Sequence, residues 1–296
     1  MKILIVLQNM GQKKGKPGGV GNASNEIQKA LNKKGHEVDI LSREDNLKIY
    51  SALGSIFPLR KKIRQLMKKE KYDVIYTQDW GMTLPMLLPY RIFKKQHFVC
   101  FCGRQENIFI IIQDLVGKIM GKRLVVIGDR LKKAFPKATL IYRGVNFKWF
   151  KPLRKKRDSI GFVDKPSELI TKEELKEIAT RTGLKPITAK NIPINKMNEK
   201  FYSKCKVFIS LPPQAGYNNV WNEAMASGAP IVIGNDRGAG TMLPFDKVNK
   251  GENRVEKITK IVKNPKKINY RKWLIDNGFS WKENANKLLR YFKKNV

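Results

Sequence analysis

The sequence predicts an α/β protein with two Rossmann-like, doubly wound domains that face each other across a cleft. Short runs of valine, isoleucine and leucine alternate with helical patterns from one end of the 296-residue chain to the other. Continuous apolar strands with helices between them are typical of parallel sheets covered on both faces. The chain is also long for one compact core and suits two domains of about 150 residues each.

The strands fall into two series, separated by the polar stretch WFKPLRKKR at residues 149–157. We therefore expect an N-terminal domain over residues 1–152 and a C-terminal domain over residues 153–296. The last helix, Trp281–Lys294, could pack back on the N-terminal domain. The expected strands are Met1–Leu7, His36–Leu41, Tyr72–Thr77, Phe98–Phe101, Arg123–Ile127, Thr139–Tyr142, Ser159–Val163, Pro186–Ala189, Val207–Leu211 and Pro230–Gly234.

The net charge is strongly positive. The chain has 60 lysines and arginines against 25 acidic residues, a formal charge of +35. Both halves carry the excess, with 29 basic and 11 acidic residues in 1–150 and 31 and 14 in 151–296. Such a field attracts anionic partners, namely phosphorylated small molecules, lipid head groups or nucleic acid. The charge alone does not choose among them.

Metal and redox sites are not expected. The three cysteines lack CxxC spacing and only two histidines are present, so a zinc site would lack ligands. Cys100 and Cys102 fall on one face of an expected strand, and we interpret them as small buried residues in a reducing cytosol. MKILIVL lacks the features of a signal peptide, and Ile108–Met120 is too short to span a bilayer. We expect a cytoplasmic protein, either soluble or peripheral on the inner face of the membrane.

A glycine-rich turn follows the first strand. Gly18, Gly19 and Gly21 stand at the start of a helical pattern, where bare backbone N–H groups and the helix dipole can meet an anion. The spacing is not that of a dinucleotide fingerprint, and no P-loop lysine follows. The turn by itself does not separate an anion site from a plain strand–helix connection.

A single carboxylate stands in AGYNNVWNEAMASGAPIVIGNDRGAG, residues 215–240. Glu223 is expected in the first turn of a short helix, Glu223–Ser227, which Gly228 ends. There it can interact with the helix dipole, or it can accept both hydroxyls of a ribose at the carboxyl end of a strand. Asn218 and Asn219 add donors and acceptors for a sugar. The residues alone leave both roles of Glu223 open.

Several stretches, in the same order, resemble the GT-B glycosyltransferases of family 4, the retaining group 1 glycosyl transferases. They cover nearly the whole chain and read MKILIVL with GGVGNASNEIQKALNKKGHEVDILS, YDVIYTQDW, LIYRGVNFKWFKP, AGYNNVWNEAMASGAPIV and FSWKENANKLLRYFKK. The resemblance implies transfer of a sugar from a UDP- or GDP-sugar to a hydroxyl of a glycan or lipid-linked acceptor. It also implies retention of configuration, no bound metal and no other cofactor.

The resemblance assigns donor-binding roles. Glu223 matches the second glutamate of the family's E-x7-E segment, which holds the ribose of the nucleotide. Tyr217, Asn218 and Asn219 then belong to the loop that contacts the donor. Gly18 and Gly19 match the turn that approaches the pyrophosphate.

The chain also departs from the family's pattern. Ala215 stands where the first glutamate belongs, so Gln214, Asn218 or Asn219 would have to orient the transferred sugar. The phosphate-binding loop is shortened, and Lys165 is its expected cation. Gln214, Asn218 and Lys165 are therefore the expected catalytic groups. They would act by positioning and electrostatic stabilisation, while the leaving phosphate takes the acceptor's proton.

The acceptor side lacks the histidine that is usual in the family. Gln78 and Asp79 in YTQDW, and Arg104 in CGRQEN, are the polar groups expected there. Each could equally be a solvated loop residue, and the sequence does not separate the two interpretations.

The densest basic run, LRKKIRQLMKKEKY, spans Leu59–Tyr72. Its apolar residues fall on one helical face, so it predicts a surface helix packed on the first domain. Its cationic rim would also suit an anionic membrane surface. Two alternatives stay open: a nucleotide- or sugar-binding GT-B protein that has lost catalysis with Ala215, and a DNA-directed glycosyltransferase or nucleic-acid binder. No recognised nucleic-acid-binding motif supports the second.

Overall fold

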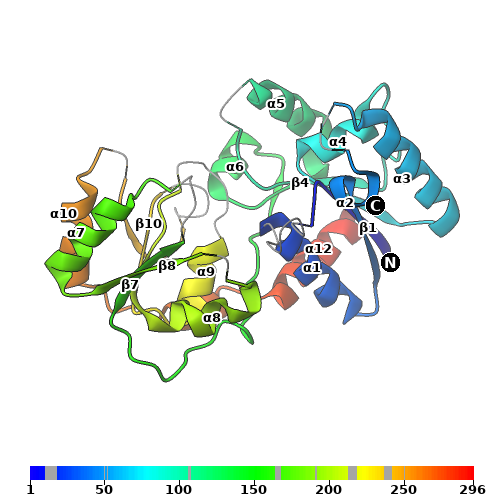
Figure 1. The fold of residues 1–296 in the computed structure, drawn as a ribbon. Helices are drawn as coiled ribbons and strands as arrows, with labels where there is room; N and C mark the ends of the chain where they lie inside the picture. The colour runs from blue at the N-terminus through cyan, green and yellow to red at the C-terminus, as the bar shows by residue number, and fades with distance from the viewer. Residues whose placement is uncertain are drawn as a thin grey trace. The chain divides into compact units, whose positions relative to one another are not determined.

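The computed structural model describes residues 1–10, 19–49, 51, 53–105, 108–163, 168–190, 192–212, 219–236, 242–249 and 251–296. Its contacts divide the chain into two compact units (Figure 1). Unit 1 comprises Met1–Arg143 and Trp281–Val296, and unit 2 comprises Gly144–Ser280. Each unit contains one parallel sheet with helices around it, which confirms the predicted fold class.

Unit 1 has a six-stranded sheet in the order β2-β1-β3-β4-β5-β6. All of its strand pairs are parallel. The six strands fall where the apolar runs predict them, because the four central strands are buried on both faces of the sheet, while the two edge strands are partly exposed. They are β1 (Lys2–Leu7), β2 (Glu37–Ser42), β3 (Val74–Gln78), β4 (His97–Phe101), β5 (Leu124–Val126) and β6 (Thr139–Leu140).

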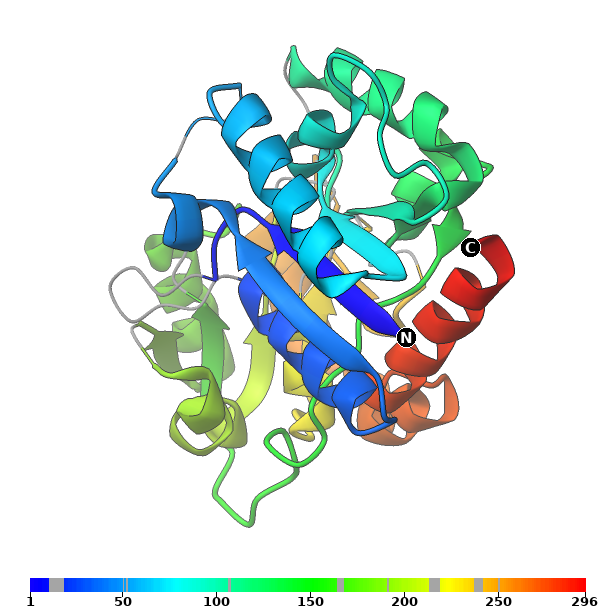
Figure 2. The ribbon, with the colours of Figure 1, turned by 90° about the vertical axis from the view of Figure 1, so that its right-hand side faces the viewer.

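One face of this sheet is covered by α3 (Ile56–Glu70), α4 (Trp80–Leu87) and α5 (Phe109–Met120), with α4 in contact with both neighbours. Figure 2 shows α3 in light blue and α5 in green on the same side of the sheet. The apolar side chains of α3 pack against β1 and β3 through Leu59, Ile63 and Met67. Shorter segments of the unit are α2 (Arg43–Leu47), η2 (Gly121–Arg123) and α6 (Asp129–Ala134).

The opposite face is covered by α1 (Gly19–Asn32) and α12 (Trp281–Asn295), which contact each other. Successive strand residues point to opposite faces, so Tyr76 and Phe98 turn toward α12. Their rings lie 5.3 and 5.1 Å from the ring of Phe292. The C-terminal helix thus completes the core of the N-terminal sheet.

Unit 2 has a five-stranded parallel sheet in the order β11-β10-β9-β7-β8. Thr171 and Glu174 form a capping box at the start of α7 (Lys172–Thr182), where each side chain bonds the other residue's backbone N–H. The strands are β7 (Ser159–Val163), β8 (Lys185–Ala189), β9 (Cys205–Ile209), β10 (Ile231–Gly234) and β11 (Asp246–Lys247). The helical segments are α7 (Lys172–Thr182), η3 (Ile194–Lys196), α8 (Met197–Lys200), η4 (Tyr202–Lys204), α9 (Asn219–Ala226), α10 (Arg254–Lys263) and α11 (Tyr270–Asp276).

Two further expectations from the sequence concern membrane-spanning helices and the cysteines. Among the helices that the structure describes, none is long and apolar enough to cross a bilayer. Cys100 is buried, as expected, but Cys102 is partly exposed and its sulfur accepts a hydrogen bond from Arg143 at 3.0 Å. The interpretation of Cys102 as a plain buried apolar residue is therefore wrong, because a guanidinium stabilises its sulfur.

Candidate functional site

In open parallel α/β sheets, ligands bind outside the carboxyl ends of the strands. The predicted site residues that the structure describes are Gly19, Gln78, Asp79, Arg104, Asn219 and Glu223. Outside the described residues lie Gly18, Lys165, Gln214, Ala215, Tyr217 and Asn218. The described part of the chain contains no group of His, Cys, Asp and Glu side chains that could hold a metal ion.

Glu223 lies within α9, not at its start. The helix already includes Asn219, and no acidic residue stands in the first turn of its described part. The prediction that Glu223 opens the helix is therefore wrong, since residues 219–222 ahead of it are helical as well. The side chain of Glu223 is buried, and its Oε2 accepts a hydrogen bond of 2.8 Å from the hydroxyl of Tyr202. A defined partner thus fixes the orientation of the carboxylate.

Tyr202 is itself held on several sides. Its side chain is fully buried, and its ring lies 5.3 Å from that of Phe208 and 5.8 Å from that of Phe150. Its backbone carbonyl accepts a hydrogen bond of 3.0 Å from Arg157. Burial, together with the neighbouring Glu223 carboxylate, raises the pKa of the Tyr202 hydroxyl well above its ordinary value. The tyrosine therefore remains a proton donor to Glu223 at physiological pH.

A second carboxylate fixes the exit of β9. Glu168 accepts hydrogen bonds from the hydroxyl of Ser210 at 2.8 Å and from the backbone N–H of Leu211 at 2.6 Å. On the other side, the amide of Asn235 donates to the carbonyl of Pro212 at 2.8 Å. These bonds hold the backbone at the carboxyl end of the central strand. The side-chain oxygen of Asn219 is buried and has no hydrogen-bond partner among the described residues.

The glycine turn of unit 1 contains two different glycines. A Cβ on Gly21 would collide with the backbone carbonyl of Met10, so only glycine lets α1 approach the end of β1 so closely. Among the described residues, nothing lies within 4 Å of a Cβ on Gly19. Gly21 therefore has a packing role that Gly19 does not share among these residues.

A cavity of about 390 Å³ lies at the carboxyl ends of the first three strands of unit 1. Gln8 follows β1, Arg43 follows β2, and Gln78 and Asp79 stand at the end of β3. We call this the unit-1 cavity; its lining also includes Ser51, Leu53, Trp80, Gly81, Met82, Gln105 and Phe109. Two of the three predicted acceptor-side residues thus line one cavity.

Gln78 and Asp79 differ in how their polar atoms are satisfied. Gln78 is buried, its Oε1 accepts from the thiol of Cys102 at 3.6 Å, and its Nε2 has no hydrogen-bond partner among the described residues. Asp79 has a φ of 77° and its side chain accepts from the N–H of Trp80, so it caps α4. Burial raises the pKa of Asp79 to about 6, with the bond from Trp80 opposing that rise. Both residues therefore offer groups that a ligand could satisfy.

Arg43 is a residue that the sequence reasoning missed. It is buried, and burial lowers the pKa of its guanidinium from the ordinary value. Its Nη2 lies 3.6 Å from Oε1 of Glu44. The same oxygen accepts a hydrogen bond of 2.8 Å from the side-chain amide of Gln8. The signal was present in the sequence, because Arg43 follows an expected strand just as Gln78 does.

Arg104 does not line the unit-1 cavity. Its guanidinium makes a two-point hydrogen-bonded ion pair with Asp114 of α5, one bond measuring 2.9 Å. The same guanidinium lies 5.3 Å from the centre of the Phe135 ring. Arg104 thus fastens the segment after β4 to α5.

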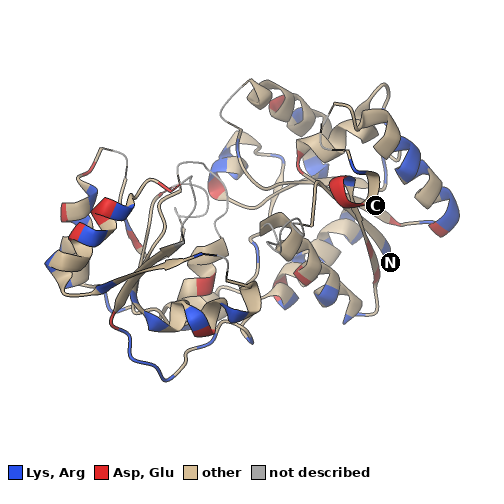
Figure 3. Ribbon diagram, viewed as in Figure 1, with Lys and Arg blue, Asp and Glu red and all other residues tan. Residues whose placement is uncertain are grey.

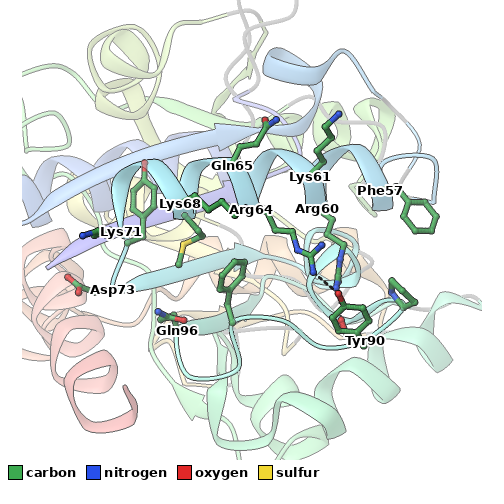
Figure 4. A pocket seen from close by; sticks show the side chains of 14 residues that line it. Phe57, Arg60, Lys61, Arg64, Gln65, Lys68, Lys71, Asp73, Tyr90 and Gln96 are labelled. Atoms are coloured by element: carbon green, nitrogen blue, oxygen red, sulfur yellow. Dashed lines mark hydrogen bonds between the residues drawn. The ribbon is translucent and has the colours of Figure 1, made fainter.

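The basic helix α3 packs as the sequence predicts. Leu59, Ile63 and Met67 are buried in the core of unit 1, so the exposed side of α3 is mainly cationic, with Phe57 exposed near its start. Figure 3 shows basic residues along α3. A groove of about 1130 Å³ runs between α3 and the segment after α4 (Figure 4). Lys61, Arg64 and Lys68 line it from α3, and Tyr90 and Phe93 line it from the other side.

Comparison with known proteins gives matches among solved structures. No family model and no curated protein matches the sequence. Sucrose-phosphate synthase from Thermosynechococcus elongatus matches with a TM-score of 0.74 at 13% identity, over 99% of both chains. An Anabaena protein solved with UDP and glucose matches with a TM-score of 0.65 at 15% identity, over 99% of this chain and 100% of that one.

The fold also occurs in an epimerase. UDP-GlcNAc 2-epimerase from Methanocaldococcus jannaschii matches with a TM-score of 0.56 at 13% identity, over 99% of this chain and 100% of that one. Identities this low show the fold alone, which is the GT-B fold of the matching glycosyltransferases. The reaction has to be argued from the residues of this chain.

Proposed function

We propose that the chain is a retaining, family 4-like glycosyltransferase that moves a sugar from a UDP- or GDP-sugar to a hydroxyl of a glycan or lipid-linked acceptor. The observation that carries the proposal is Glu223, a buried carboxylate on the helix after β9, whose orientation Tyr202 fixes within a GT-B fold. The Anabaena structure with UDP and glucose supports a nucleotide-sugar donor. The proposed reaction uses no bound metal and no other cofactor.

Unit 2 is the proposed donor domain. Glu223 accepts the ribose hydroxyls, and the Tyr202 hydroxyl keeps its carboxylate in place for them. The buried oxygen of Asn219 suits a hydroxyl donor of the bound sugar. Lys165, together with the Gly18–Gly19 turn of unit 1, is proposed to stabilise the diphosphate. Gln214, Tyr217 and Asn218 are proposed to contact the donor, with Gln214 and Asn218 orienting the transferred sugar.

Unit 1 is the proposed acceptor domain, with the acceptor in the unit-1 cavity beside Gln78 and Asp79. The acceptor oxygen forms its new bond to the anomeric carbon while the bond from that carbon to the diphosphate breaks on the same face. The leaving phosphate oxygen takes the acceptor's proton, so no protein base is consumed. Asp79 then has an orienting role, since its carboxylate can accept a hydrogen bond from a neighbouring acceptor hydroxyl.

The cationic side of α3, within Leu59–Tyr72, is proposed to contact an anionic membrane surface, which would bring the enzyme to a lipid-linked acceptor. The corresponding proposed location is the cytoplasm, peripheral on the inner face of the membrane. Lys61 and Lys68 are exposed on the groove side of α3, where they can reach lipid phosphates.

A binding-only protein is the second candidate, because Ala215 replaces a glutamate that contacts the transferred sugar in the family. The two candidates predict different affinities. In a working transferase, one sugar conjugate binds more tightly than its nucleotide diphosphate, because the sugar adds contacts. In a binding-only descendant, the diphosphate and all its conjugates bind alike.

The test is a panel of nucleotide diphosphates and their sugar conjugates, scored by thermal stabilisation of the protein, since ligands that bind the native state raise Tm. We expect ligands with one kind of nucleotide to raise Tm, and we expect one sugar conjugate to raise Tm more than its own diphosphate does. No stabilisation by any nucleotide would overturn the donor assignment. Equal stabilisation by diphosphate and conjugates would favour the binding-only protein.

A further inference from the structure

Exposed apolar side chains are concentrated in one part of unit 1. Among the described residues, eleven large hydrophobic side chains are exposed, and nine of them lie between Leu53 and Ile119. Leu53 and Phe57 stand at the start of α3, and Leu88 and Tyr90 follow α4. The others belong to α5 and the residue before it. Exposed apolar side chains gathered on adjoining elements mark an interaction surface.

Helix α5 carries the most apolar part of this surface. Ile108, Ile111, Leu115 and Ile119 are 75, 66, 58 and 42% exposed and recur at helical spacing. The opposite side of the helix is firmly packed, since Val116 and Met120 are buried and a Cβ on Gly117 would collide with the Phe135 ring. The exposed stripe therefore cannot turn inward. Figure 3 shows α5 with few charged residues.

The stripe of α5 is continuous with the groove beside α3. The Tyr90 hydroxyl accepts a hydrogen bond of 2.7 Å from Arg64 on α3 (Figure 4). The next residue, Arg91, donates to the carbonyl of Ile119 at the end of α5, at 3.3 Å. The segment after α4 thus joins the cationic side of α3 to the apolar side of α5.

The wall of the groove is fixed by a buried cation. Arg60 is 5% exposed and donates through Nη1 to the carbonyls of Pro85, Leu88 and Tyr90. Its guanidinium carbon lies 4.6 Å from the centre of the Tyr90 ring. Arg60 therefore holds the segment after α4 against α3, which keeps the exposed cations of α3 beside that segment.

We propose that the outer surface of α3, α5 and the segment between α4 and β4 docks on an anionic lipid bilayer. The apolar stripe of α5 enters the boundary between head groups and acyl chains, and the groove beside α3 holds lipid phosphates. This deepens the proposed membrane contact of α3 by assigning the apolar anchor to a different helix. It does not depend on the transfer reaction.

Charge favours a bilayer over a second copy of the chain. The apolar stripe lies beside Lys118, and the groove is lined by Lys61, Arg64 and Lys68. A second copy would bring another chain with a formal charge of +35 against these cations, whereas anionic head groups neutralise them. The one acid of α5, Asp114, is already paired with Arg104.

The experiment measures sedimentation of the full chain with vesicles of phosphatidylcholine alone and with 30% phosphatidylglycerol added. The apolar variant is Ile111→Ser with Leu115→Ser, and its matched control is Ile275→Ser, an exposed apolar residue of unit 2. The charge variant is Lys61→Glu with Lys68→Glu, and its matched control is Lys260→Glu with Lys263→Glu on α10. Circular dichroism checks that each variant is folded.

We expect the wild type to bind the anionic vesicles, and we expect this binding to weaken as salt is added. The charge variant should bind at least about tenfold more weakly, because each cation near an anionic surface contributes to affinity. The apolar variant should bind more weakly at every salt concentration, and both controls should match the wild type. Equal binding of the apolar variant and the wild type would overturn the proposal.

A second readout separates the bilayer from a protein interface. Leu115→Cys labelled with an environment-sensitive dye should shift to the blue with anionic vesicles, and labelled Ile275→Cys should not. A concentration-dependent dimer that the apolar variant abolishes, without vesicle binding, would assign the surface to a second copy instead. Nucleotide affinity, measured in parallel, tests the donor assignment independently of these outcomes.

Discussion

The carboxyl ends of the two sheets are built differently. In unit 2, the central carboxylates already have protein partners, as Glu223 accepts from Tyr202 and Glu168 accepts from Ser210 and Leu211. In unit 1, Gln78 and Asp79 line an open cavity, and the amide nitrogen of Gln78 lacks a partner among the described residues. One edge is held in advance by hydrogen bonds, while the other offers groups for a ligand to satisfy.

This difference suits the two proposed substrates. A nucleotide is a rigid and constant ligand, so fixing its carboxylate partner in advance reduces the cost of ordering side chains on binding. Acceptors differ in shape, and an open cavity with unsatisfied polar groups can select among them by which hydrogen bonds they complete. Substitutions at each edge test whether this difference governs ligand binding.

The largest effect is expected for Glu223→Gln. The amide oxygen can still accept from the Tyr202 hydroxyl, but the negative charge for the ribose hydroxyls is lost. We expect nucleotide affinity to fall by about 1.5–3 kcal/mol, as for hydrogen bonds to a charged group. Isothermal titration with UDP and GDP measures the change.

Glu223→Ala should show the same loss and also reduce the free energy of unfolding by about 1–3 kcal/mol, because the buried Tyr202 hydroxyl would lose its acceptor. A fully folded Glu223→Gln protein with unchanged nucleotide affinity would give this carboxylate a purely structural role, and the two edges would no longer differ in the proposed way.

The second prediction concerns the pH dependence of stability at the unit-1 edge. The native pKa of Asp79 is raised to about 6, above its ordinary value of 3.8. Between these values the native carboxyl holds a proton that the unfolded one releases, so the free energy of unfolding falls as pH rises from about 4 to 6 and is level above. Urea unfolding at a series of pH values measures this slope.

Asp79→Asn should remove the slope and raise the free energy of unfolding at pH 7 by about 1–2 kcal/mol, because the cost of burying the charge disappears. Asparagine suits this position, since it tolerates the φ of 77° and can still cap α4. A variant that keeps the wild-type slope between pH 4 and 6 would show that the carboxyl group is solvated.

A smaller effect is expected for Tyr202→Phe, which keeps the packed ring and removes the hydroxyl. Nucleotide affinity should fall by about 0.5–1.5 kcal/mol, because Glu223 loses the bond that orients it. The matched control is Tyr72→Phe in unit 1, which breaks a similar bond to Asp39 of 2.5 Å. If both variants change nucleotide affinity equally, the loss reflects general stability and Tyr202 has no positioning role.

The smallest effect is expected for Arg104→Met. It should lower the free energy of unfolding by about 0.5–1 kcal/mol at pH 7, since its partner Asp114 is partly exposed and the pair is screened by solvent. Acceptor KM should be unchanged, because Arg104 does not line the unit-1 cavity. A raised acceptor KM in a protein of normal stability would return Arg104 to the acceptor side.

Sequence patterns predicted the strands well, because a strand buried on both faces must be apolar along its whole length. They also placed Gln78 and Asp79 at a strand end, where the chain leaves the sheet. Tyr202 could not be found this way. Its bond to Glu223 joins η4 to α9, 21 residues apart in the sequence, and no local pattern encodes that contact.

The exposed apolar stripe of α5 could not be located from the sequence for a similar reason. An amphipathic pattern shows that a helix has an apolar face but not what covers it. On α3 that face is buried by the sheet, whereas α5 has enough apolar residues to fill its own packing site and leave a second stripe exposed. Burial decides between the two, and burial depends on tertiary structure.

The central claim is that unit 2 binds a nucleotide sugar whose sugar this chain transfers. The most direct measurement is release of nucleotide diphosphate from a panel of UDP- and GDP-sugars, with the anomeric form of the released or transferred sugar followed by NMR. We expect one sugar conjugate to release its nucleotide diphosphate, and we expect the sugar product to appear first in the donor's own anomeric configuration. Glu223→Gln should strongly reduce this release. Two results would contradict this claim. In one, the diphosphates and their sugar conjugates bind with equal affinity and no diphosphate is released. In the other, the product is an epimerised sugar instead of a transferred one.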